Sequence, residues 1–170
     1  LDIGAYGVVI PWVNNREQAE AAVRACKYPP EGLRGCGPRR AAMFGLETKE
    51  YLEKANDLTL VIVQIETMEA VENLEEIMAV PGIDAIFVGP ADLASSLGVI
   101  GQQRHPKNLE TIARILDTAT RANMPVGIFG MGPEYIKEHI DQGFKFVVVG
   151  ADASFMMHGL RDILKRIDRS

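Results

Sequence analysis

Two carboxylates follow two hydrophobic runs, and their chemistry predicts a divalent-metal site. Glu66 lies in V-Q-I-E-T at residues 63–67, and Asp92 lies in V-G-P-A-D-L at residues 88–93. A carboxylate at the end of a buried Val/Ile run is costly unless a positive charge meets it. Two carboxylates with water suit octahedral Mg²⁺ or Mn²⁺ better than Zn²⁺, which favours His and Cys. The alternative is that both acids cap or begin helices, where negative charge is also favourable.

Neighbouring residues add candidate ligand-binding groups to the same place. Side chains alternate along a strand, so Gln64 and Glu66 share one face and point toward the carboxyl end, where α/β sites assemble. Gly89 and Pro90 predict a sharp turn that exposes the backbone N–H groups of Ala91 and Asp92. Such donors near a helix start can hold a carboxylate. An ordinary strand-to-helix turn is the alternative interpretation.

Strands and helices alternate along the whole chain. The near-continuous Val/Ile strands predict a parallel sheet covered by helices, which is an α/β fold. A closed barrel of this type needs eight strands and about 250 residues. The pattern therefore predicts the parallel (β/α)8 TIM barrel family with five of the eight βα units present in this chain. The expected strands are 7–13, 58–66, 83–89, 125–130 and 144–150, and the expected helices begin after Asn14 or Asn15 and span 47–56, 68–78, 106–122, 133–143 and 155–167.

The first four residues indicate how the domain is organised. L-D-I-G at residues 1–4 is typical of a helix end, with Gly4 as its cap. We therefore expect residues 1–170 to be a single partial (β/α) barrel domain that lacks the N-terminal βα units of a longer polypeptide.

The amino-acid composition limits the kinds of partner that the protein can have. The 170 residues are 47% hydrophobic with a net charge of −5, typical of a globular protein. The acidic balance argues against a nucleic-acid partner, and no run is long enough to suggest a membrane partner. Cys26 and Cys36 form no C-x-x-C pattern, so we expect two reduced thiols in a cytoplasmic protein. The arginines of R-G-C-G-P-R-R at 34–40 could bind an anionic substrate or could be structural.

The order of the motifs resembles the HpcH/HpaI aldolase family. These are metal-dependent class II pyruvate aldolases of the 4-hydroxy-2-oxoheptanedioate and 2-keto-3-deoxy-sugar-acid type. The segments that carry the resemblance are V-Q-I-E-T (63–67), I-F-V-G-P-A-D-L-A-S-S-L-G (86–98), V-V-V-G-A-D (147–152), V-V-I-P-W-V-N-N-R-E-Q-A-E (8–20) and Y-P-P-E-G-L-R-G-C-G (28–37).

The resemblance implies roles for individual residues. Glu66 and Asp92 match the two metal-ligating carboxylates, with Mg²⁺ or Mn²⁺ as the metal and Co²⁺ as a further candidate. Gln64 matches a polar residue near the bound 2-keto acid substrate. Gly89, Pro90 and Ala91 match the turn whose backbone contacts the pyruvyl carboxylate. The catalytic general base and an Arg are expected upstream of this chain, so this portion alone is expected to be inactive.

The implied activity is that of a carbon–carbon lyase. Retro-aldol cleavage of a 4-hydroxy-2-keto or 2-keto-3-deoxy acid would give pyruvate and an aldehyde through a metal-stabilised pyruvate enolate. The family often forms hexamers that exchange a C-terminal helix, so a homo-oligomer is expected. Trp12 stands where relatives often have Met or His, which leaves the second substrate open. The alternatives are a citryl- or malyl-CoA lyase-like enzyme, a decarboxylase, or a non-catalytic partial barrel stabilised by oligomerisation.

Overall fold

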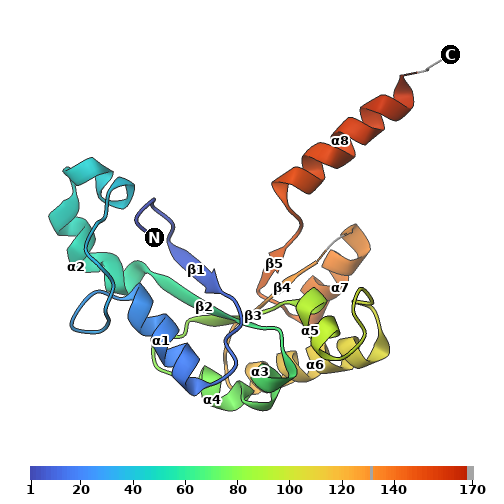
Figure 1. The fold of residues 1–170 in the computed structure, drawn as a ribbon, viewed down its shortest axis with the longest axis horizontal. Coiled ribbons are helices and arrows are strands. Elements are labelled where there is room, and N and C mark those ends of the chain that lie inside the picture. Colours follow the sequence, from blue (N-terminus) through green and yellow to red (C-terminus); the bar gives the residue numbers. More distant parts are fainter. Residues whose placement is uncertain (131, 168–170) are drawn as a thin grey trace.

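Five parallel strands form one curved sheet in the computed structural model, which describes residues 1–130 and 132–167. The strands lie side by side in chain order, and each pairs with the next one in parallel register. The predicted α/β fold with a parallel sheet is confirmed as a five-stranded half-barrel (Figure 1). The strands are β1 (Gly7–Ile10), β2 (Leu60–Ile65), β3 (Ala85–Val88), β4 (Val126–Phe129) and β5 (Phe146–Val148).

Helices follow the strands, and two of them, at residues 40–45 and 90–96, were not among the expected helices. They are α1 (Arg16–Cys26), α2 (Thr48–Leu58), α3 (Met68–Glu72), α4 (Leu74–Met78), α5 (Pro90–Ser96), α6 (Pro106–Arg121), α7 (Pro133–Gln142) and α8 (Asp152–Arg166), with a 3₁₀ helix η1 at Arg40–Gly45. The Asn15 side chain accepts a hydrogen bond from the Gln18 N–H and so begins α1 as predicted. None of the helices in the described residues has the length and apolar character needed to cross a membrane.

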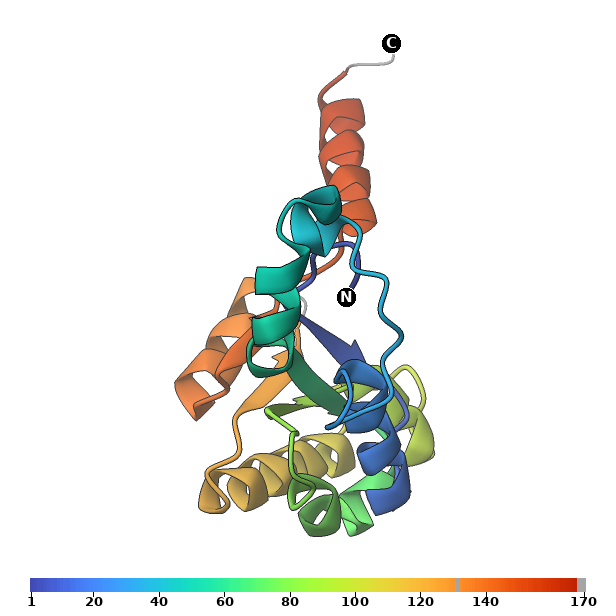
Figure 2. The same cartoon turned by 90° about the vertical axis from the view of Figure 1, so that its left-hand side faces the viewer.

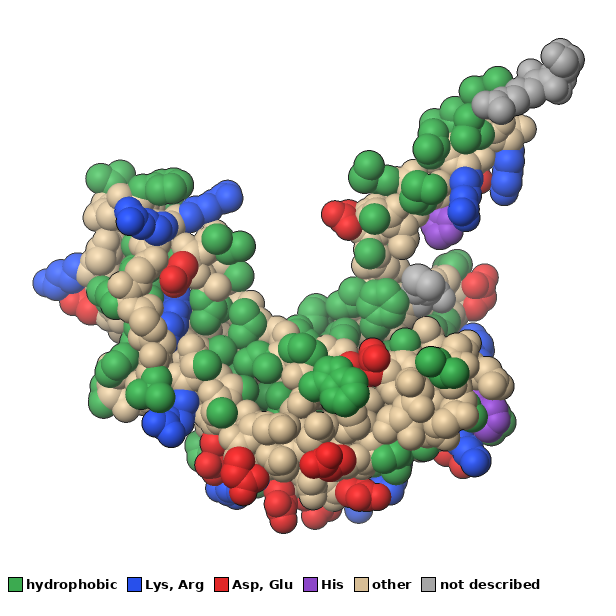
Figure 3. All heavy atoms as spheres, in the orientation of Figure 1, with side chains coloured by type: hydrophobic (Ala, Val, Ile, Leu, Met, Phe, Trp, Pro, Cys, Tyr) green, Lys and Arg blue, Asp and Glu red, His purple; other side chains and the backbone are tan. Residues whose placement is uncertain are grey.

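The two faces of the sheet differ, as the strand alternation of β2 predicts. Val61, Val63 and Ile65 are fully buried, whereas Ile62 and Gln64 on the opposite face are half-buried. Helices α1 and α3 to α6 lie along one side of the sheet, and the other side opens into a hollow lined with hydrophobic side chains (Figures 1 to 3).

Several predicted boundaries were wrong for local reasons. The first strand ends at Ile10 rather than residue 13, because Pro11 has no N–H and Trp12 adopts a positive φ of 57°. The predicted helix at 68–78 is divided at Asn73, whose φ and ψ of −94° and 13° are not helical. Residues 1–4 form a turn in which the Gly4 N–H donates to the Leu1 carbonyl, and Gly4 has the positive φ, 96°, that is typical of a capping glycine. Helix α8 begins at Asp152, three residues earlier than expected.

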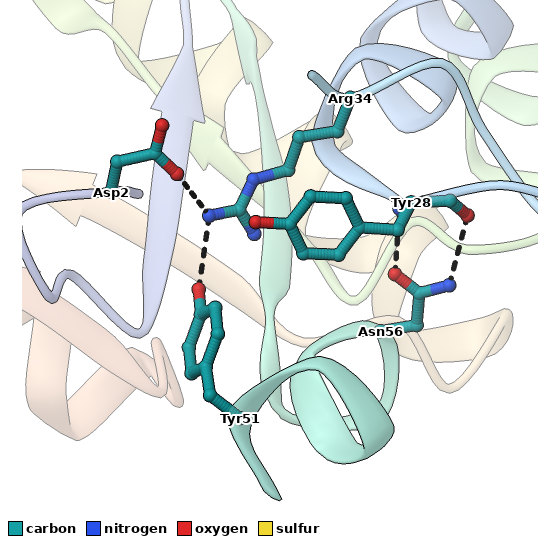
Figure 4. Close-up of polar contacts among 5 residues, drawn as sticks. All are labelled: Asp2, Tyr28, Arg34, Tyr51 and Asn56. Atoms are coloured by element: carbon teal, nitrogen blue, oxygen red, sulfur yellow. Dashed lines mark hydrogen bonds and ion pairs between the residues drawn. The ribbon is translucent and has the colours of Figure 1, made fainter. Parts of the chain in front are cut away.

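The long connection after α1 is fixed by Arg34 (Figure 4). Its guanidinium donates to the Asp2 carboxylate at 2.6 Å and to the Tyr51 hydroxyl at 2.9 Å. It also lies 4.4 Å from the centre of the Tyr28 ring. Because Arg34 is buried and these partners join the first residues, the loop and α2, the structural interpretation of this arginine is favoured.

Candidate metal and keto-acid site

The carboxyl ends of the first three strands meet at one edge of the sheet, and the candidate residues lie there. Glu66 directly follows β2, and Gly89 directly follows β3. Trp12 comes two residues after β1, on the other side of β2. This is the edge where parallel α/β folds place their sites.

The Glu66 carboxylate is buried and held by two hydrogen bonds. Only 2% of the residue is exposed. The Trp12 backbone N–H donates to Glu66 Oε1 at 2.9 Å, and the Gln64 side-chain amide donates to Oε2 at 2.5 Å. Burial raises the pKa of Glu66, and the nearby Asp92 charge adds to this, whereas the bonds from Trp12 and Gln64 lower it. No Lys or Arg pairs with Glu66 among the described residues.

Asp92 is the second acid of the candidate site. It lies in the first turn of α5, as one of the two interpretations predicted, and its side chain is exposed. Its negative charge contributes to the raised pKa of Glu66, because a like charge disfavours ionisation of a neighbouring carboxyl group. Such repulsion next to a buried carboxylate is relieved when a cation binds between the two acids. Within residues 1–130 and 132–167, no third His, Cys, Asp or Glu joins them in a metal-binding group.

The G-P-A-D turn packs directly against Gln64 and Glu66. A Cβ atom on Gly89 would lie 2.6 Å from Gln64 Nε2 and 2.6 Å from Glu66 Oε2, so only glycine fits without displacing them. Pro90 is the first residue of α5. The first backbone hydrogen bond of this helix runs from the Leu93 N–H to the Gly89 carbonyl. The N–H groups of Ala91 and Asp92 therefore have no partner in the described part of the chain.

A neighbouring helix holds this turn in place. Asn108 of α6 is fully buried and donates to the Pro90 carbonyl at 3.1 Å. The Ser96 hydroxyl at the end of α5 accepts from the Met68 N–H at 2.9 Å, which ties α5 to α3. Helix α5 is therefore anchored at its first and last residues, which favours a fixed geometry of the turn that begins it.

Sequence reasoning missed the part played by residues 12–15. Asn14 Oδ1 accepts from the Thr67 hydroxyl at 2.5 Å, and the Asn14 carbonyl accepts from the Asn73 side chain at 2.9 Å. With the bond from Trp12 to Glu66, these contacts fasten the loop after β1 to the segment after β2. No periodic pattern in the sequence predicts these bonds, because they join residues 53 or more positions apart.

Comparison with known proteins identifies the family of the chain. Residues 1–159 match the family described as HpcH/HpaI aldolase/citrate lyase. The chain is 44% identical over 165 residues to 2-dehydro-3,6-dideoxy-6-sulfogluconate aldolase of Pseudomonas putida, a match that covers 96% of this chain and 64% of that protein. It is 38% identical over 168 residues to 4-hydroxy-2-oxo-heptane-1,7-dioate aldolase of Klebsiella pneumoniae, covering 98% and 63%.

A solved structure shares the fold. The crystal structure of an HpcH/HpaI aldolase/citrate lyase family protein from Burkholderia cenocepacia J2315 superposes with a TM-score of 0.89 at 38% identity, covering 99% of this chain and 67% of that one. The chain thus spans slightly less than two thirds of the two curated relatives. On the family match and these identities, the chain belongs to the HpcH/HpaI aldolase/citrate lyase family.

Proposed function

We propose that this chain is the metal-binding part of a divalent-metal-dependent carbon–carbon lyase. The reaction is cleavage of a 4-hydroxy-2-keto or 2-keto-3-deoxy acid to pyruvate and an aldehyde. The observation that carries the proposal is Glu66, a buried carboxylate that has a second acid beside it and no Lys or Arg partner in the described residues. Membership of a family with named aldolases supports the reaction type.

Glu66 and Asp92 are the residues that would hold the metal. Their hard carboxylate oxygens fit Mg²⁺ or Mn²⁺, and the lack of a third protein ligand in the described residues suits ions that retain water. When bound, the ion supplies Lewis-acid stabilisation of negative charge on the keto oxygen of the substrate. Trp12 and Gln64 keep the Glu66 oxygens fixed by donating one hydrogen bond to each.

The turn after β3 completes the proposed binding site for the pyruvyl group. Gly89, Pro90 and Ala91 bring the backbone next to Gln64 and Glu66. The free N–H groups of Ala91 and Asp92 then donate to the substrate carboxylate. Gln64 flanks the keto acid, because its amide lies next to both Glu66 and the turn.

We assign the remaining catalytic groups to further polypeptide. Five strands cannot close a (β/α)8 barrel, and the curved sheet leaves a hydrophobic side open (Figure 3). The general base and the substrate-binding Arg then come from the other barrel units. We expect the isolated 170-residue chain to release pyruvate at least about 1,000-fold more slowly than the full-length protein, since general acid–base catalysis alone contributes about 100- to 10,000-fold. Comparable rates for the two proteins in a steady-state assay would contradict this assignment.

We propose that the protein is cytoplasmic and forms a homo-oligomer, such as a hexamer. This assembly would account for the exposed helix α8. This helix projects away from the sheet in both ribbon views and has no buried residue (Figures 1 and 2). It carries large exposed apolar side chains at Phe155, Met156, Leu160, Ile163 and Leu164. A second copy of the chain would cover them.

If α8 lies in the interface between subunits, substitutions within it should lower the molar mass of the oligomer. The double variant L160E/I163E is expected to reduce the molar mass of the full-length protein, measured by light scattering after size exclusion, because charge cannot be buried there. Lys165→Glu on the same helix is the matched charge-changing control and should leave the mass unchanged. An unchanged mass for the double variant would exclude α8 from the interface.

The proposed activity is tested by pyruvate release. We expect the full-length protein with Mg²⁺ or Mn²⁺ to release pyruvate from at least one member of a panel of 4-hydroxy-2-keto acids. The coupled readout is NADH oxidation by lactate dehydrogenase. EDTA should stop the reaction, and added metal should restore it. Failure of every panel member to yield pyruvate would count against the lyase assignment, and full activity in EDTA would count against the metal.

A further inference from the structure

Asn108 is a buried polar residue that packing alone does not explain. It lies in the first turn of α6, and none of it is exposed. Burying a side-chain amide costs free energy unless its polar atoms are bonded. The nitrogen of this amide makes two hydrogen bonds, but its Oδ1 has no partner in the described part of the chain. An apolar side chain of the same size would pack there without an unpaired acceptor, so the asparagine needs another explanation.

The two hydrogen bonds of Asn108 fix the orientation of its amide. Nδ2 donates to the Pro90 carbonyl at 3.1 Å and to the Gln103 carbonyl at 2.8 Å. Because a carbonyl can only accept, the NH₂ group and not Oδ1 must face these two oxygens. The bond to Gln103, in the loop just before α6, therefore holds the amide with its second hydrogen directed at Pro90.

The Pro90 carbonyl belongs to the same peptide unit as the Ala91 N–H. This unit is trans and planar, so its C=O and N–H groups point in opposite directions. A hydrogen bond that fixes the direction of the Pro90 carbonyl therefore also fixes the direction of the Ala91 N–H. The bond from Asn108 further polarises the unit, because hydrogen bonds in series strengthen one another.

The Ala91 N–H is one of the two donors proposed above for the substrate carboxylate. It has no partner in the described residues and is free to donate to a ligand. Gly89, two residues earlier, packs directly against Gln64 and Glu66, so the peptide unit lies close to the proposed metal ligand. A hydrogen bond to a carboxylate weakens steeply when its donor turns away, so the direction of this N–H matters for binding.

We infer that Asn108 is a positioning residue for the substrate carboxylate and acts through the Pro90–Ala91 peptide unit. It bonds to the far side of the unit and leaves the near side to the substrate. This inference rests on the proposed function and deepens it. The carboxylate is present in both the bound substrate and the transition state, so loss of Asn108 should weaken binding more than it slows the chemical step.

The test measures deuterium exchange of pyruvate in D₂O with the full-length protein, Mg²⁺ and no aldehyde. In each exchange the methyl carbon loses a proton to the catalytic base and regains a deuteron from the solvent. Asn108→Leu keeps the approximate size of the side chain and removes both donors. It is expected to raise KM for pyruvate about tenfold, as for loss of a hydrogen bond to a charged group. Its kcat should stay within about threefold of the wild type.

Metal binding separates positioning from a merely structural role. Affinity for Mn²⁺ without pyruvate, measured by electron paramagnetic resonance, should be unchanged in Asn108→Leu, because Asn108 bonds to neither proposed metal ligand. A merely structural role would instead weaken Mn²⁺ binding and lower kcat as well. Thr111→Val is the matched control, because it removes a side-chain bond to a backbone carbonyl elsewhere on α6. Its KM for pyruvate should equal that of the wild type.

A second variant guards against misfolding, and the outcomes separate the two proposals. Asn108→Ala also removes both donors but adds no bulk, and it should raise KM as Asn108→Leu does. An unchanged KM in a folded Asn108 variant, or failure of both variants to fold by circular dichroism, would overturn the inference. If the wild type exchanges no protons, the proposed enolate chemistry fails and the inference fails with it. If the wild type exchanges protons and KM does not respond to Asn108, only the inference fails.

Discussion

Glu66→Ala in the full-length protein is expected to lower kcat for pyruvate release by about 1,000-fold or more. Loss of a single group that stabilises developing charge costs about 100- to 1,000-fold, and this variant should also lose the bound metal. Asp92→Ala is expected to have a comparable effect, because each residue supplies one of the two proposed carboxylate ligands. The measurement is a steady-state assay at saturating Mg²⁺, accompanied by circular dichroism to verify the fold.

Glu69→Gln is the matched control for these variants. Glu69 is an exposed acid in the first turn of α3, only three residues from Glu66. Its replacement by Gln removes one negative charge from the same region. Its kcat should stay within about twofold of the wild type, as is usual for a surface substitution away from a site. Wild-type turnover in Glu66→Ala or in Asp92→Ala would remove that residue from the metal site.

Gly89→Ala is expected to damage the site without unfolding the protein. The added methyl group would lie 2.6 Å from both Gln64 Nε2 and Glu66 Oε2, so one or both side chains must move. We expect a loss of about 100-fold in kcat/KM, since small displacements in a site can cost this much. The free energy of unfolding should fall by about 1–3 kcal/mol, as in other overpacked cores. Enzyme kinetics and urea denaturation measure the two effects.

The control for this variant is a glycine with room for a side chain. No atom lies within 4 Å of the position of an added Cβ at Gly35. Gly35→Ala should therefore keep both activity and stability near the wild-type values. If Gly89→Ala behaved like Gly35→Ala, the close packing of the turn on Glu66 would not matter for function.

Much of the fold follows from local sequence patterns. The alternation in β2 correctly assigned Val61, Val63 and Ile65 to the buried face. The expected start of the helix at residue 106 was correct: Pro106 is the first residue of α6, and the His105 imidazole before it accepts from the Lys107 N–H. The errors arose where tertiary contacts override the pattern, as at Asn73, whose side chain bonds to the Asn14 carbonyl where the predicted helix divides.

The candidate site was only partly accessible to sequence reasoning. Strand alternation placed Gln64 and Glu66 together, and the turn chemistry of Gly89 and Pro90 was visible directly. The bond from Trp12 to Glu66 joins residues 54 positions apart and depends on a strained backbone. No periodicity encodes such a contact, because it arises only when the ends of β1 and β2 are brought together.

The metal role of Glu66 is tested most directly by a binding titration. Metal-stripped full-length protein is titrated with Mn²⁺ in the presence of pyruvate, and free Mn²⁺ is measured by electron paramagnetic resonance. The account predicts one bound Mn²⁺ per chain in the wild type and in Glu69→Gln, and at least about tenfold weaker binding in Glu66→Gln, which keeps the shape of the side chain but removes its charge. Equal Mn²⁺ affinity in Glu66→Gln and the wild type would contradict it.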